Sequence, residues 1–458
     1  MVFASPTFLF LFLPLYFLVY YGTPPRIRYV WVLLASWLFY GWWRLDFLVL
    51  LIAASLGAGA IGAAIERNRN TGNDVIARRF LTGGVVAALG LLGYFKYFNF
   101  AVDTVSRVLR AAGGSGIDLW SVVLPVGISF YIFQIVSYLI DVYRGVSPAG
   151  RSIPEVAAYV SLFPQLVAGP IVRYVEVRNE IAAPRPTTQQ LGDGAQRFML
   201  GIVKKVVIAD AVAPVVEVVF LLPTPTLVEA WLGVGAYAVQ IYFDFAAYSD
   251  MAIGLGSMMG FTFPENFNRP YHSRTITEFW RRWHMTLSRW LRDYLYVPLG
   301  GNRVSPRRTL INLLLVMGLG GLWHGAAWTF VIWGLWHGVL LALERLRILR
   351  DRSEPLLRLR TLVFVLIGWV FFRAEGPTQV WALLTGMAGV HGFGLTSLVN
   401  WQLTTGMLVA LVAGVFWIVL EDPIERLLRW WPIPTAFFVV SMVRVLAASY
   451  SPFLYFQF

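Results

Sequence analysis

The chain has 458 residues, 58% of them hydrophobic and only 14% charged, which excludes a water-soluble fold because a globule of this length cannot hide so much apolar surface. The formal net charge of +12 comes largely from arginines in short loops between apolar runs, where membrane orientation rules place them, so we expect no nucleic-acid partner. The absence of cysteine excludes disulfides, thiolate metal sites and an acyl-cysteine intermediate on this chain.

The apolar runs are about twenty residues long, the length with which a helix crosses a hydrocarbon core of roughly 30 Å. They predict an all-α polytopic membrane protein with about 11–14 transmembrane or re-entrant helices, in a single domain over residues 1–458. Proline and glycine inside several runs predict broken helices, which membranes tolerate where protein or a water-filled cavity satisfies the backbone. The expected spans are 7–22, 29–43, 47–65, 80–95, 119–140, 155–172, 198–222, 227–243, 245–262, 309–323, 326–343, 361–373, 403–420 and 432–449.

Three stretches rich in arginine set the expected orientation. They are residues 67–79, 345–360 and 421–429, and the positive-inside rule places all three on the cytoplasmic side of the lipid bilayer. With an outward N-terminus, the first three spans bring residues 67–79 to the cytoplasm. Counting the later spans onward from residues 345–360 in the same way leaves residues 453–458 on the outer face.

Residues 309–343 contain no Asp, Glu, Lys or Arg but include His324 and His337. The run is too long for one crossing of about 20 residues, and its glycines predict two short helices that meet near residues 322–325. His324 then lies at the deep end of a hairpin, where an ionisable side chain is a candidate functional residue. The alternative is a neutral imidazole that braces the helix break through a backbone carbonyl. For His337, nearer the helix end, we favour a structural role.

Residues 275–294 place tryptophan, leucine and tyrosine at helical spacing beside four arginines. This pattern predicts one basic amphipathic helix in the membrane interface, with most of its tryptophans facing lipid at headgroup level. His284 borders the apolar stripe together with Ser288, which predicts that its side chain projects toward the protein interior.

Several carboxylates stand in apolar surroundings. Asp244 and Asp250 are the most informative, because a buried acid needs a partner, and we expect pairing with arginine. Asp141 and Asp210 share this setting. The sequence has no metal-ligand spacing, no glycine-rich phosphate loop and no Gly-x-Ser-x-Gly motif, so we expect no metal.

The last residues, 451–458, are uncharged and rich in aromatic side chains. An aromatic belt at the membrane interface explains them. Tyr455 is nevertheless a hydroxyl nucleophile candidate in this tail, together with Ser451.

Long motifs in the second half of the chain resemble those of the membrane-bound O-acyltransferases (MBOAT), and shorter ones extend the resemblance over nearly the whole chain. Within the family, the chain is especially similar to the bacterial branch that O-acetylates alginate. The motifs are residues 263–267, 276–284, 291–303 and 320–325, extended by 125–130, 163–170 and 240–254.

The resemblance implies an MBOAT fold around a central tunnel and an acetyltransferase in which His324 aligns with the catalytic histidine of the family. An imidazole has the pKa near 7 that a general base for transfer from a thioester to a hydroxyl requires. His284 matches the second histidine of the polysaccharide-modifying branch, and we expect it to orient the donor or polarise its carbonyl. The implied donor is cytoplasmic acetyl-CoA or an acyl carrier, with no bound cofactor.

The tail resembles an aromatic C-terminal motif associated with D-alanyl transfer. It implies that Tyr455 accepts the acyl group as an ester and passes it to a periplasmic SGNH-type acetyltransferase, outside a bacterial inner membrane. Alginate or a similar exopolysaccharide is then the expected acceptor, with peptidoglycan, cellulose or another glycan as alternatives. A non-acylating transporter fits the composition and the broken helices equally well, and a non-catalytic scaffold is the third class.

Overall fold

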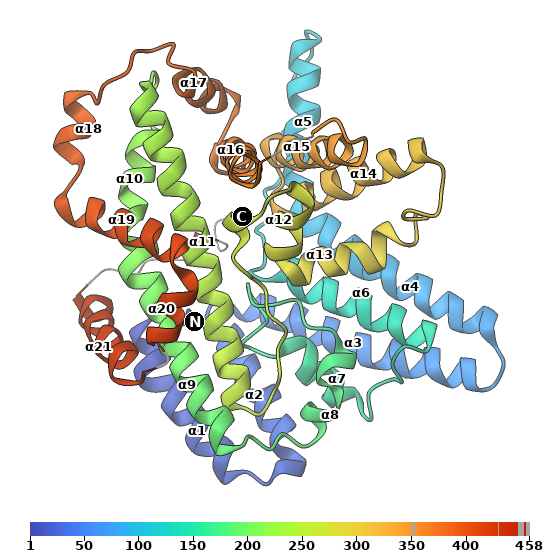
Figure 1. The fold of residues 1–458 in the computed structure, drawn as a ribbon. Helices are drawn as coiled ribbons and strands as arrows, with labels where there is room; N and C mark the ends of the chain where they lie inside the picture. The colour runs from blue at the N-terminus through green and yellow to red at the C-terminus, as the bar shows by residue number, and fades with distance from the viewer. Residues whose placement is uncertain (350–352, 429, 448–452, 455–458) are drawn as a thin grey trace. The chain divides into compact units, whose positions relative to one another are not determined.

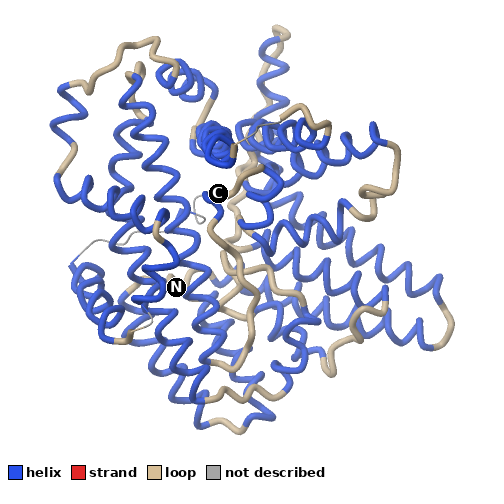
Figure 2. Tube along the Cα trace, in the orientation of Figure 1, coloured by secondary structure: helices blue, strands red, loops and turns tan. Residues whose placement is uncertain are grey.

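A computed structural model describes residues 1–349, 353–428, 430–447 and 453–454 (Figure 1). Within these residues the regular elements are all helices and no strand occurs (Figure 2). The predicted all-α fold is therefore confirmed.

The chain divides into two compact units at three boundaries. Two boundaries fall inside long helices, near residues 195 and 251, and the third falls in a loop after Pro264. The prediction of a single domain stays a prediction. The first unit contains Met1–Ala195 and Ala252–Pro264, and the second contains Gln196–Met251 and Glu265–Phe458.

The helices of the first unit approach one another through small residues. A Cβ added at Gly62 of α3 would lie 2.4 Å from the hydroxyl oxygen of Tyr138 on α6, so only glycine permits this contact. The helices are α1 (Leu13–Gly22, preceded by a π-helical segment, Thr7–Phe12), α2 (Arg28–Gly41), α3 (Leu45–Asn70), α4 (Asp74–Leu92), α5 (Phe98–Ala111), α6 (Ile128–Arg144), α7 (Ile153–Ser161) and α8 (Tyr174–Ala182).

The expected spans at 119–140 and 155–172 are wrong in their bounds. α6 begins only at Ile128, after Gly127 with a left-handed φ of 75°. α7 ends at Ser161, and residues 162–173 are turns and loop. Pro164 and Pro170 explain the early end, because proline lacks the N–H that an α-helix requires.

The second unit contains the remaining helices, and it holds the three histidines singled out by the sequence, at positions 284, 324 and 337. Its elements are α9 (Thr188–Val203, which begins in the first unit), a π-helical segment (Lys204–Ala209), α10 (Asp210–Phe220), α11 (Leu227–Met258, which ends in the first unit), α12 (Ile276–Arg282), α13 (Met285–Leu291), α14 (Pro306–His324), α15 (Trp328–Arg345), α16 (Glu354–Arg373), α17 (Pro377–Met387), α18 (Ser397–Gln402), α19 (Thr405–Val419), α20 (Glu421–Leu428) and α21 (Pro432–Ala447).

α11 is one helix of 32 residues, where the apolar runs predict two spans, 227–243 and 245–262. That expectation is wrong because Asp244, taken as the boundary between the spans, lies within the helix. Its carboxylate pairs with Lys205 at 2.7 Å, and a paired charge is tolerated in an apolar helix.

The predicted single helix over residues 275–294 is also wrong. It is two short helices, α12 and α13, separated at Trp283 and His284. His284 has φ 43° and ψ 53°, a left-handed conformation that no α-helix accommodates. The expected lipid-facing tryptophans are wrong as well, because Trp283 and Trp290 are buried in the protein.

The predicted helix break at His324 is confirmed. α14 ends at His324, Gly325 is extended, and α15 begins at Trp328. The two helices then pack side by side (Figure 1). A Cβ at Gly321 would lie 2.1 Å from the carbonyl oxygen of Phe330, and a Cβ at Gly334 would lie 2.2 Å from that of Met317. These glycines therefore allow α14 and α15 to pack in close contact.

Among the described residues, three helices are long and apolar enough to cross a membrane: Leu45–Asn70, Asp74–Ala111 and Glu354–Arg373. A fourth crossing requires Thr405–Val419 and Glu421–Leu428 to act together, although they meet at a bend of 99°. The expected total of spanning and re-entrant helices stays a prediction.

We predict that Gly334→Ala destabilises the hairpin by about 1–3 kcal/mol, the usual cost of overpacking. Its added methyl group collides with the Met317 carbonyl. Heating the detergent-solubilised protein, followed by size-exclusion chromatography, measures the loss as a lower apparent melting temperature. Gly235→Ala is the matched control, because a Cβ there has nothing within 4 Å. Equal melting temperatures for the two variants would contradict the proposed close contact.

Candidate active site

His324 lies at the turn between α14 and α15 with only 4% of its surface exposed. Aromatic rings surround the imidazole: the centroids of Trp323 and Trp333 lie 5.0 Å away and that of Phe372 lies 5.3 Å away. Such a shell excludes water and lowers the local dielectric, which strengthens any polar interaction made inside it.

His284 lies beside His324, although the two are distant in sequence. Their ring centroids are 6.1 Å apart. His284 is fully buried, and its ring stands perpendicular to that of Phe245 of α11 at 4.7 Å. The structure thus brings together two of the three predicted site residues. The third, Tyr455, lies outside the described residues.

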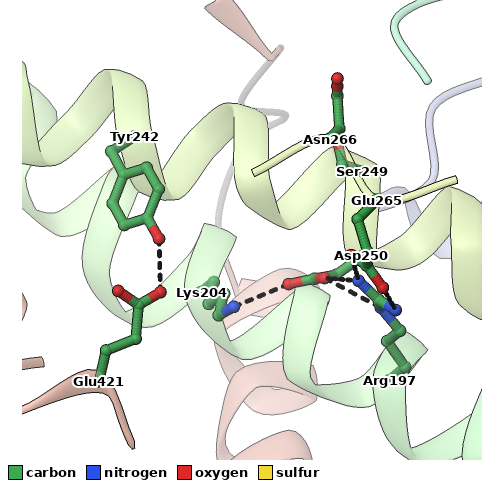
Figure 3. Close-up of polar contacts among 8 residues, drawn as sticks. All are labelled: Arg197, Lys204, Tyr242, Ser249, Asp250, Glu265, Asn266 and Glu421. Carbon is green, nitrogen blue, oxygen red and sulfur yellow. Dashed lines mark hydrogen bonds and ion pairs between the residues drawn. The ribbon is translucent and has the colours of Figure 1, made fainter. Parts of the chain in front are cut away.

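The side chain of Asn266 fixes the orientation of His284. Its Oδ1 accepts a hydrogen bond from the Thr286 backbone N–H at 3.3 Å and from the Thr286 hydroxyl at 2.9 Å. Its Nδ2 donates to the Ser249 hydroxyl at 3.1 Å (Figure 3). Because a backbone N–H only donates, the Asn266 atom that faces it is the oxygen.

The same oxygen lies 3.1 Å from Nδ1 of His284, so Nδ1 carries the proton. Burial lowers the pKa of His284 to about 3, and the ring is therefore neutral at physiological pH. A neutral imidazole protonated at Nδ1 has its lone pair on Nε2. His284 is thus an acceptor at Nε2, and its neutral ring cannot polarise a carbonyl from that atom.

Ion pairs with α9 and the adjoining π-helical segment satisfy two carboxylates of α11, the buried Asp244 and the partly exposed Asp250. Asp250 accepts from Lys204 at 2.8 Å and from Arg197 at 3.0 Å, and Arg197 also forms a bidentate pair with Glu265 (Figure 3). The predicted arginine partner is confirmed for Asp250. For Asp244 the predicted arginine partner is wrong. Its carboxylate pairs with Lys205, which lies on the π-helical segment Lys204–Ala209.

A cavity of about 500 Å³ adjoins these ion pairs. One of its carboxylates, Glu421, is buried, and its Oε1 accepts from the Tyr242 hydroxyl at 2.6 Å (Figure 3). Its Oε2 has no hydrogen-bond partner among the described residues. The lining residues include Arg197, Lys204, Arg269, Asp250, Glu265, Glu421, Glu425, Phe267 and Trp417. Carboxylates outnumber cations there.

His337 is fully buried between the rings of Phe279, Trp280 and Trp333. Neither ring nitrogen has a hydrogen-bond partner in the described part of the chain. Its predicted structural role stays a prediction.

No sequence pattern predicts a role for Asn266, Ser249 or Thr286, which together hold His284. Asn266 stands in the motif at 263–267, so the motif marks its neighbourhood. Asn266 can hold His284 only where α11 and α13 lie close to each other. No local sequence pattern encodes that proximity.

Comparison with known proteins places the chain in a family. The family model described as MBOAT, membrane-bound O-acyltransferase family, matches residues 145–365. The chain is 49% identical over 422 residues to the probable alginate O-acetylase AlgI of Azotobacter vinelandii, covering 90% of this chain and 83% of that protein. It is 44% identical to the Pseudomonas putida protein of the same name over 100% of both chains.

A more distant relative carries the same chemistry in its name. The peptidoglycan O-acetyltransferase of Helicobacter pylori is 36% identical over 437 residues, which cover 87% of this chain and 82% of that protein. The family match, the coverage of these relatives and the helical fold agree with the resemblance found in the sequence motifs. The chain is therefore an O-acyltransferase and belongs to the membrane-bound O-acyltransferase family.

Proposed function

We propose that this acyltransferase is a multi-pass protein of a bacterial inner membrane that moves acetyl groups across it. It takes acetyl from a cytoplasmic thioester, acetyl-CoA, for O-acetylation of an extracellular polysaccharide, alginate or an alginate-like polymer. A periplasmic SGNH-type acetyltransferase completes the transfer. The observation that carries the proposal is the buried contact between His284 and His324, in a chain 49% identical to a protein named for alginate O-acetylation.

The proposed step needs one base. His324 takes the proton of the attacking hydroxyl, whose oxygen forms a bond to the thioester carbonyl carbon. The carbon–sulfur bond then breaks, and the imidazolium returns the proton to the departing thiolate. The products are an oxygen ester and a free thiol, so atoms and charges balance.

The position of the proton on the His284 ring limits the roles that this residue can have in the reaction. Because Nδ1–H donates to Asn266, Nε2 presents a lone pair rather than a proton. Of the two roles expected for His284, orienting a reactant is the one that this neutral ring supports. In the proposed mechanism, Nε2 accepts a hydrogen bond from a donor group beside His324.

Tyr455 is the proposed relay. Its hydroxyl accepts the acetyl group as an ester and presents it to the periplasmic partner. The support is the aromatic tail, the lack of cysteine in the chain and the expected outer location of residues 453–458.

The second candidate acceptor is peptidoglycan. The observation in its favour is the relative from Helicobacter pylori at 36% identity, which is named for that polymer. Supplying both polymers to the reconstituted enzyme and partner decides between them, because only the true acceptor gains acetyl esters.

We predict that His324→Ala lowers acetate transfer by about 10²–10⁴-fold, the usual contribution of a general base. Labelled acetyl-CoA is added to either face of sealed vesicles, and ester formation is counted. Wild-type protein should use donor only from the cytoplasmic face. His391→Ala, in the loop between α17 and α18, is the control and should retain activity. Undiminished transfer by His324→Ala, or equal use of both faces, would contradict the proposal.

We predict that Asn266→Asp gives the reaction a new acid limb. A carboxylate beside Nδ1 favours the imidazolium and raises the pKa of His284 from about 3 toward neutrality. As the pH falls through that raised pKa, Nε2 gains a proton and no longer accepts, so kcat should fall. The wild-type ring stays neutral over the same range. Superimposable pH profiles of kcat from pH 5 to 8 would argue against a role for Nε2.

We predict that enzyme exposed to donor yields an acetylated chymotryptic peptide containing Tyr455, identified by mass spectrometry. Tyr455→Phe lacks the hydroxyl and should lose both this peptide and polymer acetylation. Tyr296→Phe, a tyrosine whose hydroxyl donates to Asn302, is the control. Full polymer acetylation by Tyr455→Phe would rule out the relay.

A further inference from the structure

Asp244 contacts the C-terminal segment directly. One carboxylate oxygen, Oδ1, accepts from Nζ of Lys205 at 2.7 Å, and the other, Oδ2, accepts from the backbone N–H of Leu454 at 2.8 Å. Both side chains of the ion pair have only 3% exposure. The carboxylate thus links the π-helical segment, α11 and the chain end.

Phe453 strengthens the same contact. Its ring is 1% exposed and lies 4.6 Å below the ammonium group of Lys205, within cation–π range. Its edge meets the ring of Tyr248 at 5.0 Å, at 85° between planes. Tyr248 follows Asp244 by one turn of α11, so one face of the helix supplies both contacts.

The two carboxylate oxygens of Asp244 have different partners. Lys205, which also pairs with Asp210 at 2.7 Å, donates to Oδ1. The N–H of Leu454 donates to Oδ2. Without Leu454, that oxygen would lose its donor inside the protein, which costs free energy because the group is buried.

We infer that Lys205, Asp244 and Tyr248 form a docking site for the chain's own segment Phe453–Leu454, and that Asp244 is a positioning residue for the adjoining Tyr455. The second half of this inference rests on the proposed function, and the first half does not. The occupant is fixed by its two contacts: an aromatic ring under the lysine, followed by a backbone N–H on the carboxylate.

The absence of cysteine makes the docking site directly measurable. Leu454→Cys introduces a single thiol at a position only 7% exposed, which should react slowly with a maleimide in the folded, full-length protein. Adding Asp244→Ala should speed labelling about tenfold to a hundredfold, the factor implied by losing one hydrogen bond to a charged group. Adding Asp250→Ala should not, because Asp250 lies on the same helix but pairs with Lys204 and Arg197.

A second variant guards against misfolding caused by the loss of the Lys205–Asp244 ion pair. Asp244→Leu combined with Lys205→Met removes both charges of that pair at similar volume, a replacement that folds tolerate well. It leaves Asp210, whose side chain is 25% exposed, and it removes the acceptor for Leu454. It should elute as a monodisperse peak and still show fast labelling of the thiol. Slow labelling in a monodisperse double variant would overturn the docking site.

Activity separates docking from positioning. Asp244→Ala in the otherwise native chain should lower kcat for acetyl transfer tenfold or more, with KM for the donor unchanged, because the inferred site holds the acceptor segment rather than the donor. Fast labelling with unchanged kcat would overturn the positioning role and leave the docking site standing. If wild-type protein transfers no acetate at all, the proposed function fails, whereas the labelling result still decides the docking.

Discussion

The ion pairs of Asp244 and Asp250 on α11 are the constraint on which the second unit depends. On this apolar helix of 32 residues the buried Asp244 and the partly exposed Asp250 both meet cations, since an unpaired buried charge costs several kcal/mol. Lys205 and Lys204 meet Asp244 and Asp250, respectively. Between these acids stands Ser249, the contact of Asn266. The ion pairs therefore fix the helix that holds the site.

A small number of direct contacts holds the two histidines of the candidate site in place. α11 supports His284 twice, by the ring of Phe245 and by the hydrogen bond from Asn266 to Ser249. The hairpin of α14 and α15 brings His324 to the same place through its glycine contacts. The proposed base, His324, and the Nε2 atom of His284 are thus held by separate elements among aromatic rings, an arrangement that suits proton transfer with little reorganisation.

The sequence predicts the helical class, the break at His324 and the presence of both histidines at one site, because glycine, apolar length and family motifs are local signals. Sequence-based prediction fails where contacts between residues distant in the sequence decide the local structure. A charged residue such as Asp244 predicts the end of a span, but its ion pair with Lys205 allows the helix to continue through it. Residues 275–294 have the periodicity of one helix, yet His284 takes a left-handed conformation that its hydrogen bonds and burial hold. The role of Asn266 exists only once α11 and α13 have met.

The π-helical segment Lys204–Ala209 has a consequence for how this protein tolerates insertions and deletions. A π turn contains one more residue than an α turn, and here it lets adjacent lysines reach separate acids. Losing one residue here would turn the π turn into a regular α turn, which still completes one revolution, so α10 would keep its facing. A one-residue deletion is therefore better accommodated in this segment than in a regular helix such as α11, where it would rotate all that follows by roughly 100°.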